Sequence, residues 1–434
     1  MATDPWKSPA DLFDEAAGII SPSIFADRDI YKLELERVFS KSWLFIAHET
    51  HIPKTGDYFA THMAEDPVVA VRQKDGSVRV FMNQCRHRGM KICRTDGGNA
   101  KAFTCTYHGW AYDIGGDLVS VPLEEKSFVG LDKSQWGARQ ARVESYKGLI
   151  FATWNMEAPC LSDYLGDAAF YLDAVLDRSA AGTEVIGGIT KWVIPCNWKL
   201  AAEQFCSDMY HGLFSHGSIF TAASIPPSSL NTGRQFRAAR GGHGTGFFVR
   251  SVPEMKITNA GERVAGYDPV ADEKAAVARL GTRGGLFVQH MTIFPSFSFF
   301  AGFNSLRVWH PRGPDKVEVW AFTIVEKDAS AATKEQLRIS STRTFSPAGT
   351  WEQDDGENWV EIQRVLRGHE ARRTSFNIQM GMGRDYGTDP DLPGSKRQAL
   401  SEDAARGFYA HWLTLMTQPD KAYAKGGNPL QAAE

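Results

Sequence analysis

The sequence predicts an α+β protein with a small all-β domain and a larger α+β domain, in which helices flank an antiparallel sheet. The chain of 434 residues is too long for one ordinary hydrophobic core. Short apolar runs separated by turn residues fill positions 44–155, which indicates a compact β domain. After residue 160 helical patterns return and alternate with strand-like stretches, as is typical of an α+β domain.

Residues 1–43 are expected to form helices that pack with the larger domain, since Tyr31, Leu35 and Val38 follow helical spacing. Residues 44–155 form the β domain, where the runs "VVAVRQ" and "VRVFMNQ" predict a hairpin closed at Asp75-Gly76. Residues 156–434 form the larger domain. Its expected helices cover 161–178, 197–214, 351–367 and 401–416, and its strand-like stretches are 245–250, 294–303 and 316–326. The glycine cluster "GGHGTG" at 241–246 is expected to be a structural turn, because it lacks the context of a nucleotide loop.

Composition and charge exclude several classes of function. The net charge of -3 indicates neither a nucleic-acid surface nor a membrane-surface patch. No apolar run approaches the roughly 18 residues of a membrane span, and the first 20 residues carry acids that targeting peptides lack. We therefore expect a cytoplasmic protein without nucleic-acid or membrane partners. The six cysteines have no framework spacing and are expected to be reduced thiols or metal ligands.

The segment 85–110 places two cysteines and two histidines in short mixed pairs. Cys85 and His87 form C-x-H, Cys105 and His108 form C-x-x-H, and 17 residues separate the pairs. A structural zinc site would accept this set in a tetrahedron. A Rieske [2Fe-2S] cluster instead takes two thiolates on one iron and two imidazoles on the other. The mixed pairs, each followed by glycine, favour the Rieske cluster over zinc, and Cys93 outside the pattern is expected to be a buried thiol.

A second constellation, D-x-x-H-x(4)-H, occupies residues 208–216. On a regular helix Gln204, Asp208 and His211 share one stripe, whereas His216 lies about 140° round from His211. Both histidines can bind one metal only if the helix ends or distorts between them, as the two glycines of this segment would permit. The residues alone are weak evidence for a metal site.

A metal ion bound by two imidazoles is often completed by one carboxylate. In the expected helix 351–367, Asp355 shares an apolar stripe with Trp351, whereas Asp354 lies on the polar face. We therefore expect Asp355 to point inward, and Asp354 to be a solvated or capping acid at the start of the helix.

These segments resemble the large (α) subunits of Rieske-type aromatic-ring-hydroxylating dioxygenases, over nearly the whole chain. "CRHRGMKIC…TCTYHGW" is similar to their Rieske motif. Met90 and Tyr107 stand where respiratory Rieske proteins have two further cysteines. "AEQFCSDMYH", "VWHPRGPDKVEVWAF" and "EQDDGENWVEIQ" look most like the toluene/biphenyl, polycyclic-hydrocarbon and 3-phenylpropionate/cinnamate branch.

The resemblance implies a terminal oxygenase that uses dioxygen and ferredoxin electrons to cis-dihydroxylate an aromatic ring, most readily that of a neutral hydrocarbon. It implies that Asp208 contacts His211 and a cluster histidine, His108, of a neighbouring subunit. The implied ligands of the [2Fe-2S] cluster are Cys85, His87, Cys105 and His108. The implied ligands of a mononuclear Fe(II) are His211, His216 and Asp355. Residues expected to line the substrate pocket are Gln204, Phe205, Met209, Phe345 and Trp351.

Three alternatives stay open at this point: an aryl-acid dioxygenase, a Rieske monooxygenase or demethylase, and a non-enzymatic electron carrier or zinc scaffold. The carrier would leave the second constellation without a purpose. An aryl acid would need a cation, for which the candidates are Arg234, Arg237, Arg240, Arg250, Arg283 and Arg307.

The sequence has no flavin or nicotinamide fingerprint and no plant-type ferredoxin spacing, so a ferredoxin and an NAD(P)H-dependent reductase must supply the electrons. The resemblance adds a small β subunit in an α3β3 assembly, or an α3 ring. Basic residues around the cluster motif offer a docking face for an acidic ferredoxin or form a solvated rim: Arg86, Arg88, Lys91, Arg94 and Lys101.

Overall fold

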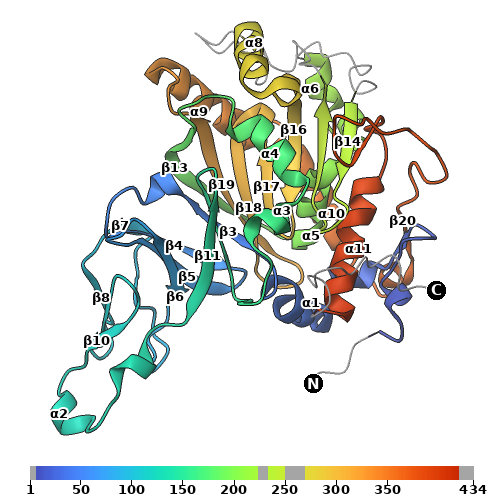
Figure 1. Ribbon diagram of the computed structural model, residues 1–434. Helices are drawn as coiled ribbons and strands as arrows, with labels where there is room; N and C mark the ends of the chain where they lie inside the picture. Colours follow the sequence, from blue (N-terminus) through green and yellow to red (C-terminus); the bar gives the residue numbers. More distant parts are fainter. Residues whose placement is uncertain (1–5, 223–232, 250–268, 420–434) are drawn as a thin grey trace. The chain divides into compact units, whose positions relative to one another are not determined.

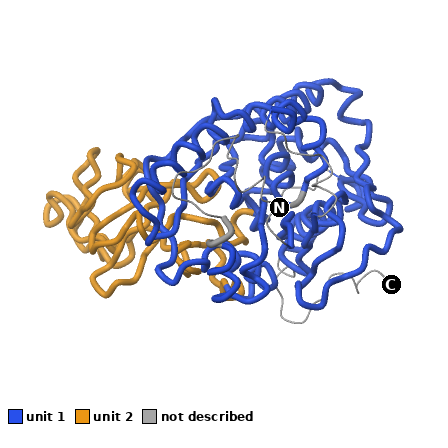
Figure 2. Tube along the Cα trace, turned by 90° about the horizontal axis from the view of Figure 1, so that it is seen from above, with its two compact units in different colours: residues 1–38, 162–434 blue, residues 39–161 orange. Residues whose placement is uncertain are grey.

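The computed structural model describes residues 6–222, 233–249 and 269–419. The chain divides into two compact units (Figure 2). Unit 1 comprises Met1–Val38 and Ser162–Glu434, and unit 2 comprises Phe39–Leu161. The sequence-based boundaries follow residues 43 and 155, whereas the structural limits follow residues 38 and 161. Among the described helices, none is both long enough and apolar enough to cross a membrane.

Unit 2 is built mainly from antiparallel strands (Figure 1). The strands of its main sheet are β3 (Leu44–His48), β4 (Asp57–Met63), β5 (Asp66–Arg72), β6 (Val78–Met82), β7 (Gly97–Asn99), β11 (Gln140–Tyr146) and β12 (Leu149–Thr153). They follow the order β3-β12-β11-β6-β5-β4-β7. The predicted hairpin is confirmed, because β5 pairs with β6 and Gly76 has the φ of 84° that such a tight turn favours.

A smaller sheet in unit 2 carries the second half of the cysteine and histidine motif. Its strands are β8 (Ala102–Thr104), β9 (Ala111–Asp113) and β10 (Leu118–Ser120), and the short helix α2 (Glu124–Ser127) follows. Both Cys85 and Cys105 belong to the buried core of this unit, together with Phe81 and Tyr112. Cys93 is buried in the same core, as predicted. The two motif thiols therefore lie against apolar side chains.

Unit 1 is organised around one large antiparallel sheet. Its strands are β13 (Thr183–Ile194), β14 (Gly233–Arg237), β15 (Gly244–Phe248), β16 (Phe287–Ile293), β17 (Phe297–Phe300), β18 (Ser305–Pro311), β19 (Val317–Glu326) and β21 (Ser395–Lys396). Their order is β13-β19-β18-β17-β16-β15-β14-β21. Residues 241–243 form a turn that leads into β15, with Gly241 and Gly242 at φ values of 85° and 67°. The predicted structural turn is confirmed there, whereas residues 244–246 already belong to the strand. A small sheet elsewhere has the order β1 (Phe13–Asp14), β2 (Ile19–Ile20), β20 (Phe376–Asn377).

The described part of unit 1 also contains helices, several of which pack against this sheet (Figure 1). They are α1 (Arg28–Glu34), α3 (Leu161–Leu165), α4 (Ala168–Leu176), α5 (Trp198–Ser207), α6 (Gly217–Ala222), α8 (Pro269–Leu280), α9 (Ala331–Phe345), α10 (Glu352–Val365) and α11 (Asp403–Thr417). Helix α5 packs against β15 to β18 and is itself contacted by α11. Helix α9 packs against β13 and β19. This arrangement confirms the predicted α+β fold with an antiparallel sheet and flanking helices.

A fully buried charge pair fixes the first helix in unit 1. The Glu34 carboxylate accepts hydrogen bonds from the Lys199 ammonium at 2.5 Å and from the indole N–H groups of Trp198 and Trp412 at 2.9 Å each. Burial lowers the pKa of Lys199, and the Glu34 charge opposes this shift. Because an unpaired charge is very costly in such a place, α1 is tied to both α5 and α11.

Candidate metal centres and active site

Two loops of unit 2 present the cysteine and histidine pairs with the same backbone pattern. The Cys85 N–H donates to the Met90 carbonyl and the Cys105 N–H to the Trp110 carbonyl, each at 2.8 Å. In return, the glycine four residues after each cysteine donates to that cysteine's carbonyl at 2.9 Å. These glycines, Gly89 and Gly109, have φ values of 79° and 74°, which a side chain would strain. The glycine after each pair thus has a structural reason.

The two imidazoles converge between these loops. The Nδ1 atoms of His87 and His108 lie 3.1 Å apart, and His87 stacks on Trp110 with the ring planes 7° apart. Tyr107 is exposed and packs against His108 at 3.8 Å between ring centroids. Two facing imidazole nitrogens beside two buried thiols match the donor set of a Rieske cluster, in which sulfur and nitrogen serve different irons.

A buried tyrosine supports the first loop. The Tyr112 hydroxyl donates to the Cys85 Sγ at 3.4 Å and accepts the Arg86 backbone N–H at 2.9 Å. Burial and the contact with Cys85 raise the pKa of this phenol, so it stays a neutral donor. Hydrogen bonds to ligand sulfur are one of the ways in which a protein sets a cluster's potential.

In unit 1, the helix expected over 197–214 ends earlier, at Ser207. Asp208 has an extended backbone, and its Oδ1 accepts the N–H groups of Tyr210 at 2.8 Å and His211 at 3.2 Å. This local cap competes with helical hydrogen bonds, so the helix expected over 197–214 was wrong beyond Ser207. The break before His211 lets both histidines turn to the same point.

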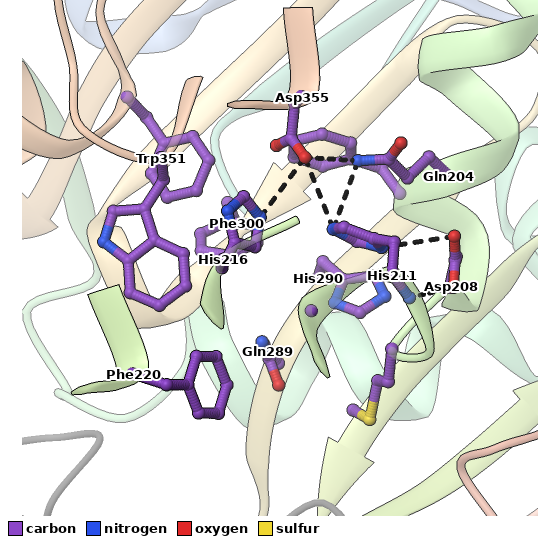
Figure 3. A pocket seen from close by; sticks show the side chains of 14 residues that line it. Gln204, Asp208, His211, His216, Phe220, Gln289, His290, Phe300, Trp351 and Asp355 are labelled. Atoms are coloured by element: carbon purple, nitrogen blue, oxygen red, sulfur yellow. Dashed lines mark hydrogen bonds and ion pairs between the residues drawn. The ribbon is translucent and has the colours of Figure 1, made fainter. Parts of the chain in front are cut away.

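The side chains of His211, His216 and Asp355 come together as a possible metal site, with donor atoms within 4.8 Å of one another. Both Nε2 atoms lie 3.3 Å from the same Asp355 oxygen, Oδ1. Asp355 and His216 are buried, and His211 is more exposed. Figure 3 shows the carboxylate between the two rings.

The shifted pKa values of the triad residues indicate a site that stabilises positive charge. Burial alone would raise the pKa of Asp355, yet contact with His211 and His216 brings it below its ordinary value. Burial would lower the pKa of His211, but Asp208 and Asp355 raise it well above its ordinary value. A divalent cation supplies this charge in place of protons, so the two imidazoles and the carboxylate fit a mononuclear iron.

Each histidine of the triad has an aspartate on its other ring nitrogen. Asp208 Oδ2 lies 3.2 Å from His211 Nδ1, and contact with His211 holds the pKa of Asp208 below its ordinary value although burial would raise it. Asp354 Oδ2 lies 3.0 Å from His216 Nδ1. The expectation that Asp354 is only a solvated or capping acid was therefore wrong, because the helix start places it against the histidine. Such carboxylates orient a ligand ring and raise its basicity.

Gln204 connects the triad to the core of α10. Its Nε2 donates to Asp355 Oδ1 at 2.8 Å, and its Oε1 accepts the Trp359 indole N–H at 2.7 Å. The Trp359 bond fixes which end of the amide faces the carboxylate. Gln204 thus holds one Asp355 oxygen in place.

A pocket opens beside the triad (Figure 3). All five residues expected to line it do so: Gln204, Phe205, Met209, Phe345 and Trp351. The sequence reasoning missed Phe220, Gln289 and His290, and placed Phe300 only within the strand-like stretch 294–303. No periodicity or spacing marks the β16 residues Gln289 and His290, because sheet register alone brings them to the triad.

Aromatic rings form one wall of this pocket. Phe300 and Phe345 lie 4.5 Å apart between centroids, and Phe345 and Trp351 stack at 6.3 Å. Trp351 also meets His216 edge to face at 4.7 Å. The wall therefore runs directly up to a triad ligand.

The described lining of the pocket contains no arginine or lysine. Of the candidate cations, Arg234 pairs with Asp389, and Arg240 is exposed. Arg250 lies outside the described residues. The other three also have carboxylate partners: Arg237 with Glu15 and Asp403, Arg283 with Asp173, and Arg307 with Glu352.

Comparisons with known proteins match one family model to most of each unit. Residues 161–418 match the family model "Ring hydroxylating alpha subunit (catalytic domain)", and residues 42–147 match "Rieske [2Fe-2S] domain". The chain is 57% identical over 432 residues to the benzene 1,2-dioxygenase α subunit of Pseudomonas putida, covering 96% of this chain and 95% of the relative. It is 56% identical to the biphenyl 2,3-dioxygenase α subunit of Rhodococcus jostii, covering 97% and 94%.

A solved structure shares the fold over nearly the full length. Naphthalene 1,2-dioxygenase from Rhodococcus sp., bound to indole, has a TM-score of 0.83 and 36% identity, covering 94% of this chain and 96% of that one. The matched families imply a [2Fe-2S] cluster in unit 2 and a mononuclear iron in unit 1. The chain belongs to the family of ring-hydroxylating α subunits that carry a Rieske domain.

Proposed function

We propose that this chain is a terminal oxygenase subunit that cis-dihydroxylates a neutral aromatic hydrocarbon. The observation that carries the proposal is the pocket, whose aromatic wall leads to His216 and whose described lining has no cation for an acid. Benzene and biphenyl are named in the relatives at 57% and 56% identity. A flat, uncharged ring is the ligand that such a wall binds best.

In this proposal Cys85, His87, Cys105 and His108 hold the [2Fe-2S] cluster. His211, His216 and Asp355 hold Fe(II). The cluster supplies electrons and the iron supplies the oxygen chemistry, which are properties of the bound groups.

The side chains around the iron ligands bind, orient and exclude water. Phe345 and Trp351 fix the plane of the substrate ring beside the triad. Gln204 keeps Asp355 oriented through its bond from Trp359. The buried aromatic side chains of the lining limit the access of bulk water to the reacting face.

We propose further that Asp208 connects the two metal centres between neighbouring copies of the chain. Its side chain contacts His211 and is 33% exposed, so a second copy has access to it. The partner group in this proposal is His108, which is half-buried in the cluster motif. The assembly that we propose for this link is an α3 ring, with small β subunits in an α3β3 complex.

As α subunits of multicomponent dioxygenases, the relatives imply a β subunit, a ferredoxin and a reductase as partners. We place the chain in the cytoplasm, where NAD(P)H is available to that reductase. Arg86, Arg88, Lys91, Arg94 and Lys101 are all exposed and offer the ferredoxin a basic face.

To test the activity, the chain is produced with a β subunit and the electron-transfer partners and supplied with toluene, biphenyl, 3-phenylpropionate or benzoate. We expect cis-dihydrodiols from the hydrocarbons, with both oxygen atoms derived from labelled dioxygen. Turnover of the acids alone, or incorporation of a single labelled atom, would contradict the proposal. A His216→Ala complex is the control for background products.

The role of Asp208 is tested by single-turnover electron transfer in an Asp208→Asn complex. Transfer should slow strongly while both metals remain bound, because the carboxylate link is lost. Transfer at the wild-type rate with both metals present would contradict the proposed link.

A further inference from the structure

A second buried charge pair lies behind the aromatic wall of the pocket. Arg307 in β18 is fully buried, and Glu352, the first residue of α10, is 3% exposed. The Arg307 Nη1 donates to Glu352 Oε2 at 2.5 Å, and its Nη2 donates to the Phe345 carbonyl at 2.6 Å. One guanidinium therefore contacts the end of α9 and the start of α10 at once.

The segment between these two contacts carries part of the active site. Phe345 is the last residue of α9, and Trp351 precedes α10, so both pocket residues lie at the tied ends. Asp355 follows Glu352 by three residues on the same helix. A shift at either contact would move the aromatic wall, the triad carboxylate, or both.

The guanidinium also packs against the rings of the wall from behind. Its Cζ lies 5.2 Å from the centroid of Phe345 and 5.6 Å from that of Phe205, and both rings line the pocket. Trp192 and Trp309 cover other sides of it. Arg307 itself is not part of the described lining, so it supports the wall without facing the substrate.

Stability alone is a poor reason for this pair. Burial raises the pKa of Glu352 to about 7, with Asp355 adding to the shift and Arg307 opposing it. In the described part of the chain, neither Arg307 Nε nor Glu352 Oε1 has a hydrogen-bond partner. Buried pairs of this kind are often replaced by apolar residues without loss of stability.

We propose that Arg307 and Glu352 are positioning residues for the oxygenation reaction. They fix Phe345, Trp351 and Asp355 relative to one another and to the sheet. This inference rests on the proposed function. It adds that the orientation of substrate and iron depends on one forked side chain outside the pocket.

The test compares two kinds of replacement. The double variant Arg307→Met/Glu352→Met removes both charges and keeps similar volume, so we expect the fold to be kept. Arg307→Lys keeps the charge, but an ammonium cannot reproduce the planar fork that reaches both Glu352 and the Phe345 carbonyl. The control is the same Met/Met exchange at Arg338 and Glu335, an exposed pair on α9.

Four quantities are measured on the complex with its β subunit: the Tm, the affinity of the mononuclear site for Co²⁺, kcat with KM for toluene, and the ratio of ring to side-chain oxygenation. We expect both variants at Arg307 to keep a Tm near that of the control. We expect kcat to fall about tenfold or more, because a misplacement of about 1 Å can cost about 100-fold in rate. The product ratio should change as well, since the ring plane is no longer fixed.

Wild-type kcat, product ratio and Co²⁺ affinity in both Arg307 variants would overturn the proposal. If the double variant does not fold, Arg307→Lys alone decides by the same measurements. If the unaltered complex oxygenates no hydrocarbon, the proposed function fails. The Co²⁺ affinity and the absorption spectrum of the Co²⁺ form still report whether Arg307 and Glu352 position Asp355.

Discussion

Replacing Tyr112 by phenylalanine removes one hydroxyl from the core of the cluster unit. That hydroxyl donates to Cys85 Sγ at 3.4 Å and accepts the Arg86 N–H at 2.9 Å, from a fully buried ring. An O–H group pointing at a ligand sulfur stabilises the reduced cluster more than the oxidised one, because reduction adds negative charge there. Tyr112→Phe should therefore lower the reduction potential.

The size of the shift follows from the energy of one hydrogen bond. A bond of this kind to a partly charged acceptor contributes about 1 to 2 kcal/mol to the difference between the two redox states. A one-electron couple changes by about 59 mV for each tenfold change in equilibrium constant, so the expected decrease is about 40 to 90 mV. The backbone N–H of Arg86 also loses its acceptor, which adds local cost to the folded loop.

A redox titration followed by absorption or EPR measures this potential. The matched control is Tyr58→Phe in the same unit, which removes a hydroxyl bonded to Thr95 Oγ1 at 2.7 Å. Its potential should stay near that of the wild type. An unchanged or higher potential in Tyr112→Phe, with the cluster fully loaded, would refute the reasoning.

Three further outcomes follow from local contacts. Asp354→Asn should lower the affinity of the mononuclear site for Co²⁺ about 10- to 100-fold, because His216 loses its orienting carboxylate. The control is Glu357→Gln, an exposed exchange on the same helix. Equal Co²⁺ affinities in the two variants would argue against this role of Asp354. Gly244→Ala should destabilise the fold by about 1 to 3 kcal/mol in denaturant titration, since the added Cβ would lie 2.4 Å from the buried Sγ of Cys206 in α5. The control Gly188→Ala should be neutral, because open space surrounds that position. Burial and two nearby carboxylates raise the pKa of Glu203 to about 8 from 4.5, so the folded state binds more protons and stability falls as pH rises between these values. Glu203→Gln should therefore raise the Tm at pH 8 and leave it unchanged below pH 4.5, and a Tm gain that does not depend on pH would contradict this cause.

The sequence predicts well what local patterns determine. The hairpin at Asp75-Gly76 follows from turn chemistry between two apolar runs, and the helices α10 and α11 follow from their periodicity. Periodicity could not show that α5 ends at Ser207. There the Asp208 side chain takes backbone N–H groups that a longer helix would need, and this competition depends on one side chain.

The sequence also could not predict contacts between residues that lie far apart in the chain. Asp354 lies on the polar face of the helix expected from the sequence, yet at the start of α10 its carboxylate contacts the His216 imidazole. Arg307 was a candidate cation for an acidic substrate, and its charge is instead matched by Glu352. A list of charged residues does not say which charges are already paired. Only the packing of strands and helices far apart in the chain does.

The anchoring of α1 determines when each unit can fold during synthesis. The Glu34 carboxylate accepts a hydrogen bond from Trp412, which follows it by 378 residues. The first helix therefore has all its partners only after almost the whole chain has been synthesised. The cluster unit needs no later part of the chain for its main sheet, because its first strand, β3, pairs with β12 near the end of the same unit. We therefore expect the cluster-binding unit to be complete on the ribosome while the N-terminal helix still lacks its partners. A [2Fe-2S] cluster can be inserted into the nascent chain before the iron site it serves has been made.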